Sequence, residues 1–155
     1  MPALIARKQI RVSGIVQGIG FRPFVYRLAR RFQLHGSVRN TSEGVLVEVE
    51  GRPDALERFI QALANEHPPF ARIEETAVTD LEPTGENGFT IRQSAAREAE
   101  FVLVSPDLAA CEDCLREFTD PRNRRFGYPF PNCTNCGPRY TIIRDIPYDR
   151  PMTAR

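Results

Sequence analysis

The sequence lacks several features on which whole classes of proteins depend. Its 155 residues include no tryptophan, two histidines and a single lysine, Lys8. Any chemistry that needs a lysine ammonium therefore depends on that one residue. No stretch approaches the roughly 18 consecutive apolar residues of a membrane-spanning helix. The apolar run Pro2–Ala6 is too short for a signal-peptide core, and charged residues follow it at once. These absences predict a cytoplasmic protein.

A large excess of charge of either sign is also absent. The chain has 21 lysines and arginines against 20 aspartates and glutamates, a formal net charge of +1. Proteins that bind nucleic acid or an anionic membrane through bulk charge usually carry a larger positive excess. The composition therefore predicts no membrane partner and disfavours nucleic acid as a partner.

Cysteine is confined to the last third of the chain, at Cys111, Cys114, Cys133 and Cys136. In a reducing cytoplasm such residues are more often metal ligands or reactive thiols than disulfides. The stretch at 94–100, SAAREAE, is small and polar, as a linker would be. We therefore predict one domain over residues 1–93, a linker over 94–100 and a cysteine-containing module over 101–155.

The first domain alternates strand and helix patterns. Apolar residues at Phe21, Phe24, Val25, Leu28 and Phe32 form one face of a helix, and Gly36 helps to end it. The other predicted elements are a strand at Gln9–Ile15, a hairpin of Ser37–Arg39 and Val45–Glu50 around a turn at Asn40–Gly44, a helix at Pro53–Asn65, and strands at Ile73–Leu81 and Phe89–Gln93. The first six of these elements follow the order β-α-β-β-α-β, which predicts an α+β, ferredoxin-like sandwich: an antiparallel sheet with two helices on one face.

The segment Gly14–Arg22 joins the first strand to the first helix and reads GIVQGIGFR. Its three glycines allow a tight loop, and the free N–H groups of the following helix make a ready anion site. Arg22 adds a rigid fork of donors suited to phosphate oxygens. The P-loop lysine and the dinucleotide-binding glycine pattern are missing, which disfavours ATP or NAD binding here. Taken alone, a glycine-rich loop with an arginine is more often just a turn without a binding role.

Two separated motifs resemble the acylphosphatase family over roughly residues 7–93: Gly14-x-Val16-Gln17-Gly18-x-Gly20-Phe21-Arg22 and Gly36-Ser37-Val38-Arg39-Asn40-Thr41-x-x-Gly44. The resemblance implies that Arg22 binds the phosphate and that Asn40 orients the attacking water. We expect backbone N–H groups of the loop to complete the phosphate site, which is predicted to comprise Gln17, Gly18, Ile19, Gly20, Phe21 and Arg22. Asn40 by itself is more often a turn residue that caps its own hairpin.

The four cysteines follow the pattern Cys-x2-Cys-x18-Cys-x2-Cys, typical of a zinc site. Four thiolates would form a closed tetrahedral shell, so the predicted zinc, one per chain, is structural rather than catalytic. A redox dithiol or a pair of disulfides are the alternatives. Arginines and aromatic residues alternate between the two cysteine pairs and could stack on single-stranded nucleic acid; otherwise these aromatic residues pack within the module or on a neighbouring domain.

Taken together, the two parts resemble the N-terminal part of the [NiFe]-hydrogenase maturation carbamoyltransferase family, HypF. The resemblance rests on Phe126–Arg144 and Ile146–Thr153, in addition to the first domain. It implies hydrolysis of carbamoyl phosphate to carbamate and phosphate. Further domains of the same enzyme would then form a carbamoyl-adenylate with ATP and pass the carbamoyl group to the C-terminal cysteine of HypE. The chain departs from the family in having one cysteine quartet and no later domains. The alternatives are a free-standing acylphosphatase with an accessory zinc module and a zinc-ribbon nucleic-acid binder.

Overall fold

The computed structural model describes residues 4–93, 109–131, 133 and 136. The predicted linker at 94–100 lies outside the described residues, as does much of the predicted cysteine-containing module. Within the first domain the chain forms β1 (Ala6–Ile15), α1 (Phe21–Arg31), β2 (His35–Thr41), β3 (Gly44–Gly51), α2 (Pro53–Asn65), β4 (Arg72–Leu81) and β5 (Phe89–Ile91). A third helix, α3 (Glu112–Thr119), lies in the cysteine-containing part.

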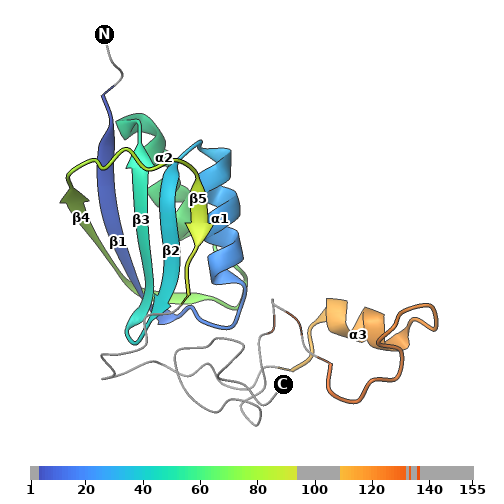
Figure 1. The fold of residues 1–155 in the computed structure, drawn as a ribbon. Coiled ribbons are helices and arrows are strands. Elements are labelled where there is room, and N and C mark those ends of the chain that lie inside the picture. Colours follow the sequence, from blue (N-terminus) through green and yellow to red (C-terminus); the bar gives the residue numbers. More distant parts are fainter. Residues whose placement is uncertain (1–3, 94–108, 132, 134–135, 137–155) are drawn as a thin grey trace.

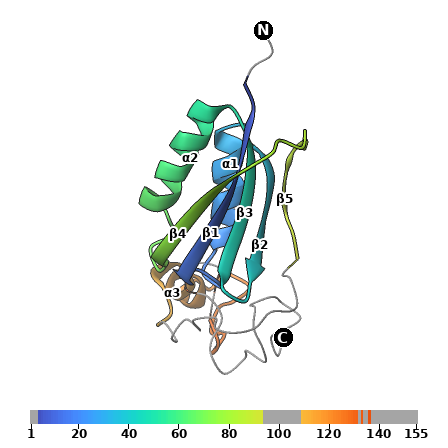
Figure 2. The same ribbon diagram turned by 90° about the vertical axis from the view of Figure 1, so that its left-hand side faces the viewer.

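The five strands form one sheet in the order β4-β1-β3-β2-β5, with α1 and α2 on one face (Figures 1 and 2). The predicted α+β sandwich is therefore confirmed. The predicted antiparallel sheet is wrong in one respect, because β5 pairs with β2 in parallel. The reason is topological. β4 ends beside the start of β1, at the end of the sheet where β2 also begins, and the chain crosses there to the opposite edge (Figure 1). A strand that starts at that end must run in the direction of β2.

The core lies between the sheet and the two helices. Period-two alternation places the valines of β3 toward the helices, and period-3.6 spacing does the same for the apolar residues of α1 and α2. The side chains that are at most 3% exposed in this layer include Ile10, Val12, Val38, Val45, Val47, Val49, Phe21, Val25, Leu28, Leu56, Phe59 and Leu63. None of the helices in the described part of the chain is long and apolar enough to cross a membrane.

Two local predictions need correction. Gly36 does not end α1; Gln33 instead takes the left-handed conformation, with a φ of 55°, directly after the helix. Gly36 already belongs to β2, where a Cβ atom would lie 2.0 Å from the carbonyl oxygen of Glu48 on β3. The hairpin turn is also shorter than predicted. Asn40 pairs with Val45 and Thr41 with Gly44, so only two residues, at 42–43, connect the strands, and Asn40 lies inside β2.

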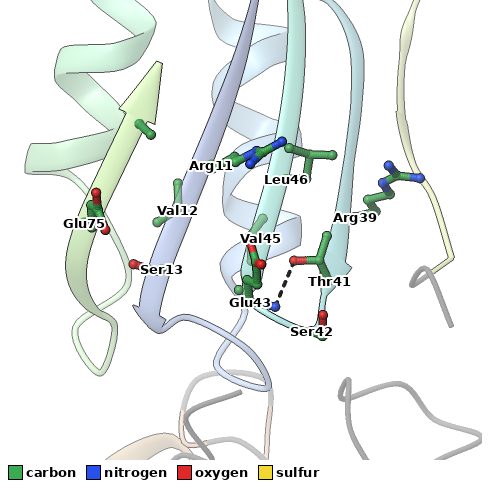
Figure 3. Close-up of a pocket in the computed structure, with 12 residues that line it drawn as sticks. Arg11, Val12, Ser13, Arg39, Thr41, Ser42, Glu43, Val45, Leu46 and Glu75 are labelled. Carbon is green, nitrogen blue, oxygen red and sulfur yellow. Dashed lines mark hydrogen bonds between the residues drawn. The ribbon is translucent and has the colours of Figure 1, made fainter. Parts of the chain in front are cut away.

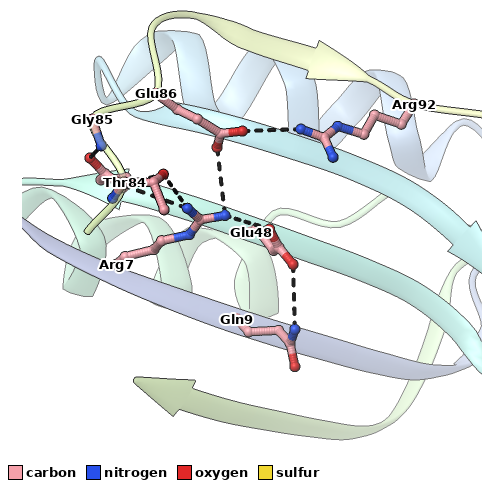
Figure 4. A network of polar contacts seen from close by, with 8 residues as sticks. Arg7, Gln9, Glu48, Thr84, Gly85, Glu86 and Arg92 are labelled. Atoms are coloured by element: carbon pink, nitrogen blue, oxygen red, sulfur yellow. Dashed lines mark hydrogen bonds and ion pairs between the residues drawn. The ribbon is translucent and has the colours of Figure 1, made fainter. Parts of the chain in front are cut away.

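The β4–β5 connection is fastened to the helix-free face of the sheet by a network of charges around Arg7 (Figure 4). Arg7, on β1, is only 8% exposed. Its guanidinium lies 2.6 Å from Glu48, 3.9 Å from Glu50 and 3.7 Å from Glu86, and also donates to the hydroxyl of Thr84. Because Thr84 and Glu86 belong to the connection, the network holds it against the sheet.

The carboxylate of Glu50 is the buried partner in this network. It is 4% exposed and accepts backbone N–H groups from Thr84 and Gly85, both at 2.8 Å. Burial alone would raise the pKa of Glu50, but these hydrogen bonds and the Arg7 guanidinium outweigh it and lower the pKa. The pKa of Glu48 is lowered too, since contacts with Arg7 and Gln9 outweigh its partial burial. Glu48 and Glu50 are therefore stabilised as carboxylates in the folded state.

Candidate active site and cysteine cluster

The predicted anion-binding loop and Asn40 lie at the same end of the sheet. β1 and β2 both run antiparallel to β3, so their carboxyl ends meet at one edge. The loop that follows β1 leads into α1, and Asn40 is the second-last residue of β2. Asn40 is 1% exposed and occupies the same row across the sheet as Val45 and Val12, both core residues. Its side chain therefore belongs to the face that carries α1.

The loop owes its shape to glycines and to two buried aliphatic anchors. Gly18 and Gly20 have φ values of 75° and 78°, in the left-handed region that other residues rarely adopt. Val16 and Ile19 are 1% and 0% exposed, so their side chains fix the loop to the core. The backbone between these anchors is thereby held in one tight curve, as an anion site requires.

The amino end of α1 is well suited to an anion. Gly20 is the N-cap, no side chain of the described residues caps the helix there, and its first turn contains no acidic residue. No carboxylate within that turn therefore competes with an anion for the helix dipole and the N–H groups. Pro23 lies in this turn, where its missing N–H removes no helical hydrogen bond. Arg22 directly precedes Pro23 in the same turn and is half-buried.

The side chain of Gln17 connects the loop to the hairpin that carries Asn40. It is 3% exposed, and its Nε2 donates to the carbonyl oxygens of Thr41 at 2.7 Å and of Gly44 at 2.8 Å. Sequence reasoning had assigned Gln17 only through its backbone N–H, and it missed this contact. The sequence offered only a polar residue between Val16 and Gly18; its burial, which the structure shows, is what requires hydrogen-bond partners.

The four cysteines come together although 18 residues separate the two pairs in sequence. Their sulfur atoms all lie within 4.8 Å of one another. The Sγ–Sγ distances are 3.4 Å for Cys111 and Cys133, 3.8 Å for Cys114 and Cys136, and 3.9 Å for Cys133 and Cys136. A zinc ion with sulfur ligands at about 2.3 Å in a tetrahedron separates them by about 3.8 Å, so this set fits zinc.

The local structure around the cysteines also suits a cation. Cys111 caps α3, Cys114 lies in its first turn, and the backbone N–H of Cys133 donates to Cys136 Sγ at 3.4 Å. Burial and the neighbouring thiols raise the pKa of Cys114, whereas N–H and thiol donors outweigh burial and lower the pKa of Cys136 to about 7. Four thiolates this close are mutually repulsive unless a cation lies between them. A zinc ion would supply that charge.

The residues between the cysteine pairs are largely exposed. Phe126, Tyr128 and Phe130 are 56%, 44% and 66% exposed, and the rings of Tyr128 and Phe130 meet edge to face at 6.0 Å. Arg125 is partly neutralised by Glu117, with an N–O distance of 2.7 Å. The ring contact between Tyr128 and Phe130 lies within the module. The nucleic-acid alternative stays an untested prediction.

A separate hollow of about 440 Å³ opens on the helix-free face of the sheet, above the β2–β3 turn (Figure 3). It is lined by Arg11, Ser13, Arg39, Thr41, Leu46 and Glu75, among others, and by neither Arg22 nor Asn40. The predicted catalytic residues therefore belong to the opposite side of the sheet. The hydroxyl of Thr41 accepts the N–H of Glu43 at 3.2 Å, which closes the turn beneath the hollow.

Comparison with known proteins separates the sheet domain from the cysteine-containing part of the chain. The acylphosphatase family profile matches residues 8–91, and a profile described as the HypF finger matches residues 110–143. The acylphosphatase of Thermotoga maritima is 41% identical over 85 residues, which cover 54% of this chain and 93% of that protein.

Longer relatives match nearly the whole chain. The carbamoyltransferase HypF of Rhizobium leguminosarum bv. viciae is 50% identical over 150 residues, 97% of this chain and 19% of the relative. A crystal structure of full-length HypF in a phosphate- and nucleotide-bound form superposes with a TM-score of 0.90 at 46% identity, covering 99% of this chain and 20% of that one. The chain thus spans about a fifth of the length of these carbamoyltransferases.

Proposed function

The chain belongs to the acylphosphatase family, and on this premise we propose that residues 4–93 hydrolyse an acyl phosphate at the loop that follows β1. The observation that carries the proposal is the meeting of three elements at one sheet edge: the glycine-rich loop, the uncapped amino end of α1 with Arg22, and Asn40 at the end of β2. An anion bound by the first two would lie beside the third.

In the proposed mechanism the phosphoryl oxygens accept hydrogen bonds from backbone N–H groups of residues 17–21 and from the Arg22 guanidinium. These donors stabilise the charge that spreads over the phosphoryl oxygens in the transition state. The Asn40 amide holds a water molecule in line with the bond to be broken. The water oxygen bonds to phosphorus, the phosphorus–oxygen bond to the acyl group breaks, and the acyl oxygen leaves as a carboxylate. The water proton goes to the phosphate or to solvent.

Little else is required of the protein, because a carboxylate is a good leaving group and needs no strong general acid. The work consists of positioning and charge stabilisation, which backbone N–H groups, one arginine and one amide can supply. The mechanism uses neither histidine. His35 accepts the backbone N–H of Gly88 at 2.8 Å, and Nδ1 of His67 lies 3.0 Å from the carbonyl oxygen of Pro68.

The proposed substrate is carbamoyl phosphate, because the long relatives are carbamoyltransferases. Its hydrolysis at Arg22 and Asn40 yields carbamate and phosphate. In the complete enzyme the carbamate would pass to further domains for carbamoyl-adenylate formation with ATP and transfer to the C-terminal cysteine of HypE. The proposed domain limits are 1–93 for the hydrolase and 101–155 for the cysteine module, joined by a linker at 94–100, in the cytoplasm.

The cysteine quartet would hold one structural zinc ion. When bound, the ion supplies charge neutralisation and cross-links the two halves of the module. Because all four positions of the tetrahedron are taken by Cys111, Cys114, Cys133 and Cys136, none is left for water or substrate. The module is therefore assigned no part in the hydrolysis.

The test is release of phosphate from carbamoyl phosphate by the wild-type chain and by the Arg22→Ala and Asn40→Ala variants. We expect kcat/KM to fall by more than about 100-fold in each, the range seen when a donor to a developing charge is removed. Arg27→Ala is the matched control, since Arg27 is an exposed arginine of the same helix. Equal rates in all four proteins would reject the site.

Substrate range separates the proposal from its alternatives. A free-standing acylphosphatase, favoured by the match over 93% of the Thermotoga maritima protein, should hydrolyse benzoyl phosphate at least as well as carbamoyl phosphate. A strong preference for carbamoyl phosphate supports the carbamoyltransferase assignment. Binding to single-stranded DNA that weakens steeply with salt would instead support the nucleic-acid alternative.

A further inference from the structure

The side chain of Gln17 is the direct link between the two parts of the proposed active site. Gln17 follows β1, whereas its acceptors flank the hairpin turn: Thr41 directly follows Asn40, and Gly44 begins β3. One amide nitrogen thus holds both ends of the turn, at 2.7 Å and 2.8 Å from the two carbonyl oxygens. Thr41 and Gly44 are partners in the β2–β3 register, so the amide spans the last rung of the hairpin.

The chemistry of this contact is specific to an amide. The nitrogen of a glutamine side chain carries two hydrogen atoms, one for each carbonyl oxygen. A glutamate at this position would place an acceptor against two acceptors, and a methionine would fill the space but donate nothing. The site is also dry, since Gln17 is 3% exposed and its neighbours Val16 and Ile19 are 1% and 0% exposed. Water is therefore poorly placed to replace the lost donors.

Glycines in the loop and in the hairpin allow the two segments to approach each other closely. Gly18 has a positive φ and lies directly after Gln17, and Gly44 has a φ of 143°. A Cβ atom on Gly44 would meet the carbonyl oxygen of Val12 at 2.1 Å, so the hairpin end passes close over β1. Glycines permit this close approach without enforcing it, whereas a two-acceptor hydrogen bond enforces it.

We propose that Gln17 is a positioning residue, which sets the place of Asn40 relative to the phosphate loop through its hydrogen bonds to Thr41 and Gly44. This inference rests on the proposed function. Gln17 then acts on the attacking water only through Asn40, while phosphate binding by the loop and Arg22 is largely independent of it. Displacement of a positioning group by about 1 Å can lower a rate by about 100-fold, because the in-line geometry is lost.

The experiment compares the wild-type chain with Gln17→Met, Gln17→Asn, Asn40→Ala and the Gln17→Met/Asn40→Ala double variant. Gln9→Met is the matched control, because Gln9 is a glutamine of β1, the strand that precedes Gln17, and contacts Glu48 at 3.4 Å on the helix-free face of the sheet. The measurements are kcat and KM for carbamoyl phosphate and competitive inhibition by inorganic phosphate.

For Gln17→Met we expect kcat to fall by about 100-fold. The inhibition constant for phosphate should change by less than about threefold, and the double variant should be about as slow as Asn40→Ala alone. Gln17→Asn, whose shorter amide reaches one carbonyl at most, should be intermediate. Multiplicative effects of the two substitutions, or an unchanged kcat in Gln17→Met, would overturn the inference. If Gln17→Met does not fold, the same reasoning is tested by Gln17→Asn.

A second readout separates this inference from the proposed function. Amide hydrogen exchange in Gln17→Met should accelerate at residues 16–21 and at 41–44 together, while the β1–β4 ladder keeps its wild-type protection. This result is expected whether or not the wild-type chain hydrolyses carbamoyl phosphate. Unchanged exchange in the hairpin would refute the link, even if the enzyme is active. An inactive wild type with accelerated exchange would refute the function and leave the link.

Discussion

Replacement of Arg7 by methionine tests the charge network that holds the β4–β5 connection on the sheet. The substitution keeps much of the aliphatic stem but removes the guanidinium, which lies 2.6 Å from Glu48, 3.9 Å from Glu50 and 3.7 Å from Glu86. The carboxylates remain, and the side chain of Glu50 is only 5% exposed. The negative charges of Glu48 and Glu50 would then be close together without the guanidinium, whereas Glu86 would keep its ion pair with Arg92 at an N–O distance of 3.0 Å.

The expected loss follows from burial. Removing one partner of a fully buried ion pair costs about 3–5 kcal/mol, because the other charge is left uncompensated. The side chain of Glu48 is 23% exposed and that of Glu86 is 30% exposed, so part of their charge is solvated. We therefore expect the lower limit, about 3 kcal/mol of unfolding free energy. For a domain of this size that corresponds to a decrease in Tm of roughly 12–24 °C.

Lys8→Met is the matched control. Lys8 is the next residue on β1, and its Nζ lies 2.5 Å from Asp80, whose side chain is 84% exposed. A solvated pair of this kind contributes about 0.5 kcal/mol. Urea unfolding followed by circular dichroism at 222 nm measures both losses, with zinc present throughout so that the cysteine module is unchanged. An Arg7→Met loss no larger than that of Lys8→Met would refute the network as a stabilising element.

The pH dependence of the unfolding free energy tests the same charge network independently. The pKa values of Glu48 and Glu50 are lowered in the folded state, so their contribution to stability is full above the unfolded-state pKa and is lost as pH falls through the lower folded-state values. In the wild type, stability should decrease on acidification below about pH 4.3, the ordinary value for glutamate. The gap between wild type and Arg7→Met should narrow over that range, since protonated carboxyls no longer need the guanidinium. A gap that widens on acidification would contradict this account.

Three further predictions concern the turn, the cysteines and the helix surface. Gly44→Ala should destabilise the domain strongly, because the φ of Gly44 is 143° and the new Cβ would lie 2.1 Å from the carbonyl oxygen of Val12. Gly127→Ala should cost only the strain of a positive φ, because a Cβ there has no atom within 4 Å. Thermal unfolding of the two variants compares these costs. Cys114→Ser should abolish binding of one zinc per chain, measured by metal analysis after dialysis, and leave hydrogen-exchange protection in the sheet unchanged; zinc retention would refute the four-thiolate site. Glu66→Gln removes an exposed ion pair and should leave the thermal midpoint nearly unchanged; a large shift would show that exposed pairs matter here.

Sequence reasoning reached the elements of the first domain because their signals are local. The helix Pro53–Asn65 was predicted with its observed bounds, since a proline starts it and its apolar spacing is regular. The same reasoning missed the parallel pairing of β5, because strand neighbours are set by where a connection crosses the sheet. It also placed Asn40 in the turn. The register between β2 and β3 decides that Asn40 is in the strand, and register depends on which faces are buried.

The sequence by itself determined the residue types of the candidate sites: the glycine-rich loop with Arg22, the asparagine in the hairpin and the spacing of the four cysteines. The sequence carries this information because each of these features is a pattern of residue types and spacings along the chain. Only the tertiary structure decided that the sulfur atoms of all four cysteines lie within 4.8 Å of one another and that Gln17 spans the loop and the hairpin. Such contacts join residues far apart in sequence, and only the fold brings these residues together.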